Sequence, residues 1–227
     1  MRKVLAISGI DTDVGKSVVT GCIAKGLSDQ GHRVVTVKAV QTGCSGISDD
    51  IRVHRRFMGM DLLEQDRSGV TCPYLYRKPC SPHLAARIEG EAIDSQKISD
   101  VVRLLSEEYQ PVLVEGAGGL FVPLTDDLLM IDYFREQGWP MVLVSGPRLG
   151  SINHTLASLE ALASRGMELA AIVYNRFGSE DAEICSDSLG VIGRFCKSYG
   201  YSCPVLELGP VSPNPDLDCS KFARVCS

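Results

Sequence analysis

Apolar residues rich in valine, isoleucine and leucine recur along the chain in six short runs. The runs lie at 3–8, 33–40, 111–116, 140–146, 169–175 and 204–208. Within each run the apolar residues are nearly continuous, whereas a strand with one solvated face alternates apolar and polar residues. The pattern therefore predicts strands of a parallel sheet that is covered on both faces.

Segments with helical periodicity separate these runs. The clearest lie at 16–31, 81–90 and 95–109. Gly31 stands where a helix ends, and Ser81 followed by Pro82 is typical of a helix start. Strands alternating with helices predict an α/β fold with right-handed crossovers. We expect a mostly parallel sheet of about seven strands with helices on both faces.

The chain of 227 residues contains no repeat, low-complexity tract or linker that would mark a second domain. We therefore expect a single domain that spans residues 1–227. The segment 41–80 is the least regular part, and irregular insertions in α/β folds often carry binding function. The proline-rich segment 209–218 predicts a loop.

Composition narrows the possible partners and the location. Hydrophobic residues make up 44% and charged residues 22%, and the formal net charge is −5. These values are ordinary for a soluble globular protein and give no reason to expect nucleic acid as the partner. No apolar run approaches the roughly 20 residues that cross a bilayer. The N-terminal run is too short for a signal peptide and leads directly into a glycine loop. We expect a cytoplasmic protein without a membrane partner.

The nine cysteines are an odd number and include no CxxC pair, and the four histidines are scattered. Structural zinc sites need close, paired ligands, which this pattern does not offer. Buried free thiols in a reducing cytosol account for the cysteines better.

The stretch "GIDTDVGKS" at 9–17 follows the first predicted strand and precedes the first predicted helix. In that context it predicts a P-loop, whose backbone amides surround phosphate oxygens. Lys16 would neutralise the β- and γ-phosphates, and the Ser17 hydroxyl can bind Mg²⁺. Five residues separate Gly9 from Gly15 where the commonest motif has four. The alternative is an ordinary glycine turn before a helix.

Three acidic residues are candidates for the metal side of such a site. Glu115 ends a predicted strand beside small residues, where a second Mg²⁺ ligand of a P-loop protein belongs. A solvated acid at a strand end is the alternative. Asp49 and Asp50 begin a predicted helix. Favourable interaction with the helix dipole explains these two acids as well as metal binding does.

Lys38 lies at the end of the second apolar run. A lysine in a valine-rich strand is costly to bury unless it meets an anion, although it could also extend to the surface. If this strand neighbours the first, Lys38 lies on the same edge as the P-loop. A second cation there would stabilise charge that develops during phosphoryl transfer.

The stretch "GPRLGSINHT" at 146–155 follows another predicted strand and opens a helix. The N-terminal amides of that helix, with the Asn153 side chain, could bind a carboxylate. Helix capping explains Asn153 and His154 equally well.

Together these motifs resemble the ATP-dependent dethiobiotin synthetases. The resemblance runs in order through nearly the whole chain, in "GIDTDVGKS", "VKAVQTG", "SDD", "PYLYRKPCSPHLA", "VEGAGGLFVPL", "GPRLGSINHT" and "VYN". The "SPH", "VEGAGG" and "LGSINHT" stretches are much more specific than a P-loop, and the extra loop residue is typical of this family.

The resemblance implies a P-loop α/β domain that forms a homodimer, with each site near the subunit interface. It implies a ligase of biotin biosynthesis that uses MgATP, CO₂ and 7,8-diaminononanoate. The CO₂ enters as a carbamate on one amine, the carbamate is phosphorylated, and the other amine closes the ureido ring. The products are dethiobiotin, ADP and phosphate.

The resemblance also assigns roles at matching positions. It implies contact with the γ-phosphate and the carbamate by Thr12, Lys16 and Lys38. It implies metal coordination by Ser17, Asp50 and Glu115, with Asp49 as an alternative to Asp50. It implies binding of the diamine acid by Thr42, Leu149, Gly150 and Asn153, with Asn153 on its carboxylate. The residues that it implies for nucleotide binding are Asp13, Val14, Gly15, Lys16, Ser17, Val18, Asp50, Glu115, Gly116, Ala117, Gly118, Asn175, Arg176, Gly209, Pro210 and Val211, with Asn175 and 209–211 on the adenine.

Asp11 and Asp13 are unexpected in a loop that binds phosphate. They could orient the loop, pair with neighbouring cations or face the amino groups of the diamine.

Two other classes of protein fit part of the pattern. An amide-forming relative in cobalamin synthesis usually carries a glutaminase domain, for which 227 residues leave no room. A nucleotide-driven switch typically carries an extra lysine where Asp11 stands. A nucleotide-binding module without chemistry is a third alternative, which Lys38 and the substrate-side motifs disfavour.

Overall fold

A parallel sheet of six strands forms the centre of the computed structural model, which describes residues 2–177, 181–211 and 217–226. The strand order is β2-β5-β1-β6-β7-β8. The strands are β1 (Val4–Gly9), β2 (Val35–Lys38), β5 (Val112–Gly119), β6 (Met141–Ser145), β7 (Leu169–Asn175) and β8 (Val205–Leu208). Each of the six predicted runs overlaps one of these strands, and every pairing in this sheet is parallel as predicted.

The described residues supply six strands to this sheet, one fewer than the expected number of about seven. Two further strands, β3 (Gln41–Thr42) and β4 (Leu75–Tyr76), form a separate parallel pair. They lie in the segment 41–80, which the sequence marked as irregular. Each has only two residues, which is too short to leave a pattern of hydrophobicity.

Helices connect the strands. They are α1 (Lys16–Asp29), α2 (Asp49–Met58), α3 (Glu64–Arg67), α4 (Pro82–Ile88), α5 (Ser95–Leu105), α6 (Met130–Gln137), α7 (Ser151–Ser164), α8 (Ala182–Ser198) and the 3₁₀ helix η1 (Ser220–Cys226). The three clearest predicted helices correspond to α1, α4 and α5, and the helices predicted to start at Asp49 and within 146–155 correspond to α2 and α7. Ser81 is the N-cap of α4 and Pro82 its first residue, as predicted. The predicted loop 209–218 contains residues 212–216, which lie outside the described residues.

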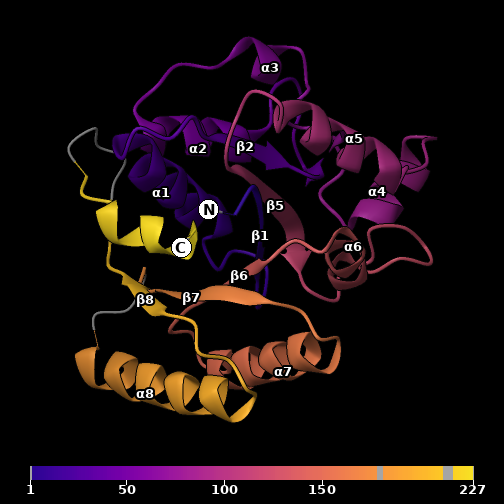
Figure 1. Cartoon of the computed structure of the whole chain (residues 1–227). Helices are drawn as coiled ribbons and strands as arrows, with labels where there is room; N and C mark the ends of the chain where they lie inside the picture. The colour runs from indigo at the N-terminus through magenta and orange to yellow at the C-terminus, as the bar shows by residue number, and fades with distance from the viewer. Residues whose placement is uncertain (1, 178–180, 212–216, 227) are drawn as a thin grey trace.

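The sheet separates two apolar clusters, because alternate residues of each strand point to opposite faces. Leu5 and Ile7 of β1 pack with α1 and with Phe222 of η1 on one face. Ala6 packs on the other face with residues of α5, α6, α7 and α8. Figure 1 shows α1 and the C-terminal helix on one side of the strands, and α5 and α6 on the other. Both faces are thus covered, as the continuous apolar runs predict.

Strand order brings the candidate residues to one edge. Glu115 of β5 pairs in register with Ile7 of β1 on one side and with Lys38 of β2 on the other. Strand β2 therefore neighbours β5 rather than β1, so the adjacency on which the Lys38 prediction was conditioned is wrong. Lys38 nevertheless lies at the P-loop edge, because parallel strands share the edge that holds their carboxyl ends.

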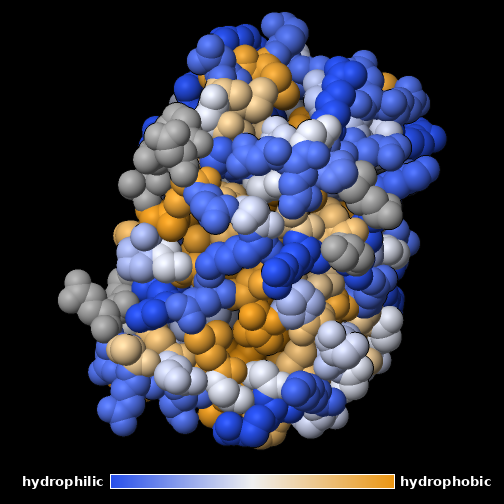
Figure 2. All heavy atoms as spheres, turned by 60° about the vertical axis from the view of Figure 1, so that its left-hand side comes forward, coloured by the Kyte–Doolittle hydropathy of each residue, from blue (hydrophilic) through white to orange (hydrophobic). Residues whose placement is uncertain are grey.

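Hydrophilic and apolar residues are both found on the surface. Figure 2 shows hydrophilic residues over much of one face, with apolar residues gathered between them. No helix in the described part of the chain is long and apolar enough to cross a membrane. All nine cysteines are free thiols, and only Cys80 and Cys203 are not classed as buried, as the sequence predicts.

Candidate active site

The glycine loop joins β1 to α1 and packs tightly. Gly15 has a left-handed φ of 91° and precedes the first residue of α1. A Cβ atom on Gly15 would lie 2.2 Å from Nδ2 of Asn175. Among the described residues no side chain caps the N-terminus of α1. Its amides and its positive dipole end are therefore available to an anion.

The two aspartates of this loop do not compete with an anion for those amides. The carboxylate of Asp11 accepts a hydrogen bond from the Thr12 amide at 2.7 Å and forms an ion pair with Arg148. Its backbone oxygen accepts from Nζ of Lys16 at 2.8 Å. Asp13 is exposed and has a φ of 57°, which is uncommon outside glycine. Asp11 thus orients the loop and pairs with a neighbouring cation, two of the three roles that we considered.

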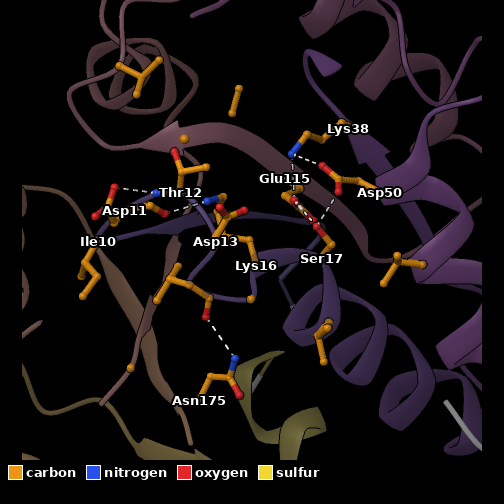
Figure 3. A pocket seen from close by; sticks show the side chains of 18 of the residues that line it. Ile10, Asp11, Thr12, Asp13, Lys16, Ser17, Lys38, Asp50, Glu115 and Asn175 are labelled. Carbon is orange, nitrogen blue, oxygen red and sulfur yellow. Dashed lines mark hydrogen bonds and ion pairs between the residues drawn. The ribbon is translucent and has the colours of Figure 1, made fainter. Parts of the chain in front are cut away.

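Glu115 is the centre of the polar cluster beside the loop (Figure 3). Its side chain is completely buried. Oxygen Oε1 accepts from Nζ of Lys38 at 2.8 Å and from Oγ of Ser17 at 2.9 Å. Oxygen Oε2 accepts from Oγ1 of Thr20 at 2.9 Å and lies 2.7 Å from Nε2 of His54. The carboxylate therefore has two polar neighbours on each oxygen.

Asp50 completes this cluster from the first turn of α2. Its Oδ1 lies 2.8 Å from Oγ of Ser17, within reach of the same hydroxyl hydrogen, and its Oδ2 lies 2.5 Å from Nζ of Lys38. Asp49 is exposed and has no such contacts with these groups. Of the two candidate acids at the start of α2, the geometry thus favours Asp50.

Lys38 is buried and has three acceptors for its three N–H groups. They are the Asp50 carboxylate, the Glu115 carboxylate and the Gly116 backbone oxygen, which is 3.0 Å away. Burial lowers the pKa of Lys38, but Glu115 and Asp50 outweigh burial and raise it above the ordinary value. Burial likewise raises the pKa of Glu115, but Lys38 and His54 outweigh it and lower that pKa strongly. Both groups are therefore charged at neutral pH.

Lys16 has a different electrostatic environment. Burial and repulsion from Lys38 lower its pKa to about 8, against attraction from Glu115, Asp50 and Asp13. Its ammonium group is still mostly protonated at pH 7. The buried ammonium groups of Lys16 and Lys38 thus repel each other beside the glycine loop, and an anion with several negative charges would relieve this repulsion.

These residues line a cavity of about 1110 Å³. Such a volume exceeds the range of about 300–1000 Å³ that is usual for small-molecule sites. The predicted site residues that line it are Thr12, Asp13, Val14, Gly15, Lys16, Ser17, Val18, Lys38, Thr42, Asp50, Glu115, Ala117, Gly118, Asn175 and Val211. The cavity therefore brings together predicted site residues that lie far apart in the sequence, from Thr12 to Val211.

Other predicted residues do not line this cavity. They are Gly116, Leu149, Gly150, Asn153, Arg176, Gly209 and Pro210. The Arg176 guanidinium instead pairs with Glu207 at 2.8 Å. Leu149 is fully exposed, and Gly150 and Asn153 are exposed at the start of α7. The three diamine-side residues at the start of α7 are therefore exposed and do not line the cavity of their own chain.

Asn175 joins the end of β7 to the P-loop. Its Nδ2 donates to the Val14 backbone oxygen at 3.1 Å, and its Oδ1 accepts from the Phe177 amide at 3.2 Å. One hydrogen and one lone pair of the amide remain for a ligand. Phe177 and Val211 also line the cavity here, so this end offers apolar surface beside a polar amide.

The sequence did not identify several residues of the site. His54 and Thr20, both fully buried, contact Glu115. Gln41, Arg148, Phe177 and the stretch 79–82 line the cavity. His54 follows Asp50 by four residues on α2, so helical spacing could have placed both on one face. The other residues leave no comparable signal.

Known proteins are similar to this chain over nearly its whole length. A family model described as "AAA domain" matches residues 3–220. The chain is 53% identical over 207 residues to the ATP-dependent dethiobiotin synthetase BioD of Chlorobaculum tepidum, which covers 91% of this chain and 87% of that protein. It is 50% identical over 181 residues to the ATP-dependent dethiobiotin synthetase BioD 2 of Haemophilus influenzae, covering 80% and 95%.

Two solved structures share the fold. The septum site-determining protein MinD of Pyrococcus horikoshii, complexed with Mg-ADP, matches with a TM-score of 0.55 and 17% identity, covering 100% of this chain and 95% of that one. A ParA family ATPase from Chlorobium tepidum matches with a TM-score of 0.55 and 16% identity, covering 98% and 96%. At these identities the likeness establishes a common fold and nothing about activity.

Proposed function

Since this chain belongs to the ATP-dependent dethiobiotin synthetases, we propose that the cavity beside Glu115 is where it closes the ureido ring. The observation that carries the proposal is the meeting of Lys38, Ser17 and Asp50 on the buried Glu115 carboxylate, next to the glycine loop. A nucleotide-driven switch needs the loop but has no use for a second substrate pocket. The cavity is large enough for a nucleotide and a diamine together.

The chemistry is phosphoryl transfer followed by ring closure. A carbamate oxygen attacks the γ-phosphorus of ATP, the bond from that phosphorus to the bridging oxygen breaks, and ADP leaves. The second amine then attacks the carbonyl carbon of the carbamic-phosphoric anhydride and loses a proton, and phosphate leaves with the C–O bond electrons. The products are dethiobiotin, ADP and phosphate.

The chain supplies positive charge where this reaction develops negative charge. The loop amides and Lys16 would hold the β- and γ-phosphates, with Thr12 beside them. Lys38 would stabilise the carbamate and the phosphoryl group during transfer. The raised pKa of Lys38 keeps it an ammonium group for this role. Asn175, with Val211 and Phe177 near it, would contact the base.

The oxygen ligands that Mg²⁺ prefers meet at one point of this site. Ser17 lies within hydrogen-bond distance of both the Asp50 and the Glu115 carboxylates. The described residues contain no group of three or more His, Cys, Asp or Glu that could form an all-protein metal cage. Mg²⁺ needs no such cage, because waters and phosphates complete its shell. We assign its protein ligands to Ser17, Asp50 and Glu115, where Mg²⁺ would screen the charge of the β- and γ-phosphates.

The diamine site would involve a second subunit. Thr42 lines the cavity, whereas Leu149, Gly150 and Asn153 are exposed at the start of α7. A fully exposed leucine beside a helix N-terminus that no described side chain caps fits a buried surface in a homodimer. We therefore place the subunit interface at this segment, with Asn153 on the substrate carboxylate. The free thiols fit a reducing cytoplasm.

Purified protein with MgATP, bicarbonate and 7,8-diaminononanoate tests the function. The expected result is phosphate release that requires the diamine, with dethiobiotin detected by mass spectrometry. Phosphate release at the same rate without the diamine would indicate a nucleotide-driven switch instead.

The proposed interface has its own test. Leu149→Glu would place a carboxylate in the interface, so we expect a dimeric wild type and a monomeric variant by analytical ultracentrifugation. Leu104→Glu on α5 is a matched control, because Leu104 is also exposed but lies outside the proposed interface. An unchanged mass for Leu149→Glu would contradict this placement.

A further inference from the structure

The two oxygens of the Glu115 carboxylate contact different groups. Oε1 contacts Lys38 and Ser17, both of which line the cavity. Oε2 contacts Thr20 and His54, neither of which lines it. A carboxylate oxygen has about two lone-pair sites. Each oxygen thus has two neighbours, but those of Oε2 lie outside the cavity lining, whereas those of Oε1 belong to it.

His54 is completely buried, and each of its ring nitrogens has a polar partner. Glu115 is ionised and can only accept, so Nε2 of His54 must carry the hydrogen that points to Oε2. On the other side of the ring, Nδ1 lies 3.0 Å from Oγ1 of Thr36. Thr36 also accepts from the Arg55 guanidinium at 2.9 Å.

Arg55 is itself held in place. Its Nε and Nη2 donate to the two carboxylate oxygens of Asp66, each at 2.8 Å. Both residues are buried, and Thr71 donates to the same carboxylate at 2.7 Å. The chain of contacts from Asp66 through Arg55 and Thr36 therefore fixes the ring of His54, and the ring fixes Oε2 of Glu115.

We propose that His54 is a positioning residue, which together with Thr20 holds Oε2 of Glu115 so that only Oε1 is presented to the magnesium ion of the bound nucleotide. The inference rests on the proposed metal role of Glu115 and assigns His54 a part in it. Groups that orient a metal ligand through its second atom typically change metal affinity or activity about 10- to 100-fold when they are lost.

The test compares nucleotide binding with and without the metal. We would measure the dissociation constant of a fluorescent ADP analogue in Mg²⁺ and in EDTA for the wild type, His54→Leu, His54→Asn and His54→Gln. Leucine removes the donor, asparagine is too short to reach Oε2, and glutamine returns an N–H at about the position of Nε2. His32→Gln, a partly exposed histidine after α1, is the matched control.

The expected result is specific to the metal. His54→Leu and His54→Asn should lose about 10- to 100-fold of the tightening that Mg²⁺ gives to the wild type, with little change in EDTA. His54→Gln should recover most of this loss, and His32→Gln should behave as the wild type. If leucine prevents folding, which thermal melting reports, the asparagine and glutamine variants carry the comparison.

Two results would overturn the inference in distinguishable ways. Equal tightening by Mg²⁺ in the wild type and His54→Asn, or equal losses in Mg²⁺ and in EDTA without rescue by glutamine, would mean that His54 only packs. A wild-type affinity that Mg²⁺ leaves unchanged would instead refute the metal role of Glu115, and the inference with it.

Discussion

At the scale of single residues, the site combines charges that would be costly apart. Lys38 and Glu115 are both buried and each is the other's main compensation. Removing one member of such a pair leaves an uncompensated buried charge. Their shared contacts with Asp50 and Ser17 place this compensation where a phosphoryl group would be transferred. The arrangement favours an anion with its own metal ion over an empty charged pocket.

Lys38→Ala should suppress catalysis far more than nucleotide binding. The ammonium group is proposed to act on charge that develops in the transition state, so we expect kcat to fall about 100- to 1000-fold. Steady-state kinetics and ADP titration measure the two effects, with exposed Lys197→Ala as the control. Parallel losses in kcat and in affinity would assign Lys38 to binding alone.

Gly15→Ala should damage nucleotide binding. The new Cβ would meet Nδ2 of Asn175 at 2.2 Å and would sit on a backbone with a φ of 91°. Gly31→Ala is a matched control, since Gly31 has a φ of 85° with nothing within 4 Å of the new atom. Both variants bear strain of about 1–2 kcal/mol. Only Gly15→Ala should lose affinity in ADP titration, and equal affinities would contradict the role of this contact.

At the scale of elements, the buried pair of Arg55 and Asp66 ties α2 to α3. Asp66→Asn should lower the free energy of unfolding by about 3–5 kcal/mol, because Arg55 is then left buried with its charge uncompensated. Urea denaturation at pH 7 measures this loss. Asp126→Asn, which breaks an exposed pair with Arg87, should change stability very little. Similar effects of the two variants would contradict the argument.

The same pair predicts a pH dependence. Burial raises the pKa of Asp66, but the donors of Arg55, Thr71 and Leu63 outweigh burial and lower it below the ordinary 3.8. A lowered pKa stabilises the fold above the unfolded value, and this stability is lost as the pH falls through the folded value. The difference between wild type and Asp66→Asn should be constant from pH 7 to about 4.5 and shrink below about 4. A difference that grows on acidification would contradict the assignment.

Packing of η1 against α1 gives a test with opposite signs at two glycines. In Figure 1 the C-terminal helix lies beside α1. A Cβ on Gly26 of α1 would meet the Cys219 backbone oxygen at 2.2 Å, whereas one on Gly193 of α8 meets nothing within 4 Å. Gly193→Ala should stabilise by about 0.5–1 kcal/mol, and Gly26→Ala should destabilise by about 1–3 kcal/mol. Thermal melting measures both, and stabilisation by both would contradict close packing of η1.

The elements that the sequence predicts well are those with a strong local signal. All six long strands coincide with continuous apolar runs, and the start of α4 coincides with Ser81 and Pro82. The pair β3 and β4 has no such signal. The position of β2 beside β5 was also not predictable, because strand order is decided by how helices cover the sheet and not by any one segment.

The site was predictable to the extent that its chemistry is local. The glycine loop with Lys16 and Ser17 is recognisable from one continuous stretch of sequence. The choice between Asp49 and Asp50 required the rotation of α2, and the contact of His54 with Glu115 required the packing of α2 against the sheet. Contacts between segments 61 or more residues apart, such as this one, leave no trace in local spacing.

In the molecule as a whole, the edge of the sheet that holds the carboxyl ends of the strands places three sets of polar groups in one cavity. The loop after β1 offers amides, β2 and β5 offer Lys38 and Glu115, and β7 offers Asn175. This arrangement accounts for a reaction in which one substrate is phosphorylated and then closes on itself. In the proposed reaction the γ-phosphoryl group of ATP is transferred directly to an oxygen atom that came from CO₂.

An isotope experiment identifies the atom that receives the phosphoryl group. Excess enzyme, MgATP and 7,8-diaminononanoate would be mixed with ¹⁸O-labelled CO₂ and quenched within one turnover, before the label exchanges with water. We expect the released phosphate to carry one ¹⁸O atom, because the carbamate oxygen that attacks phosphorus leaves with it. Dethiobiotin formed together with unlabelled phosphate would mean that the phosphoryl group is not transferred to a carbamate oxygen.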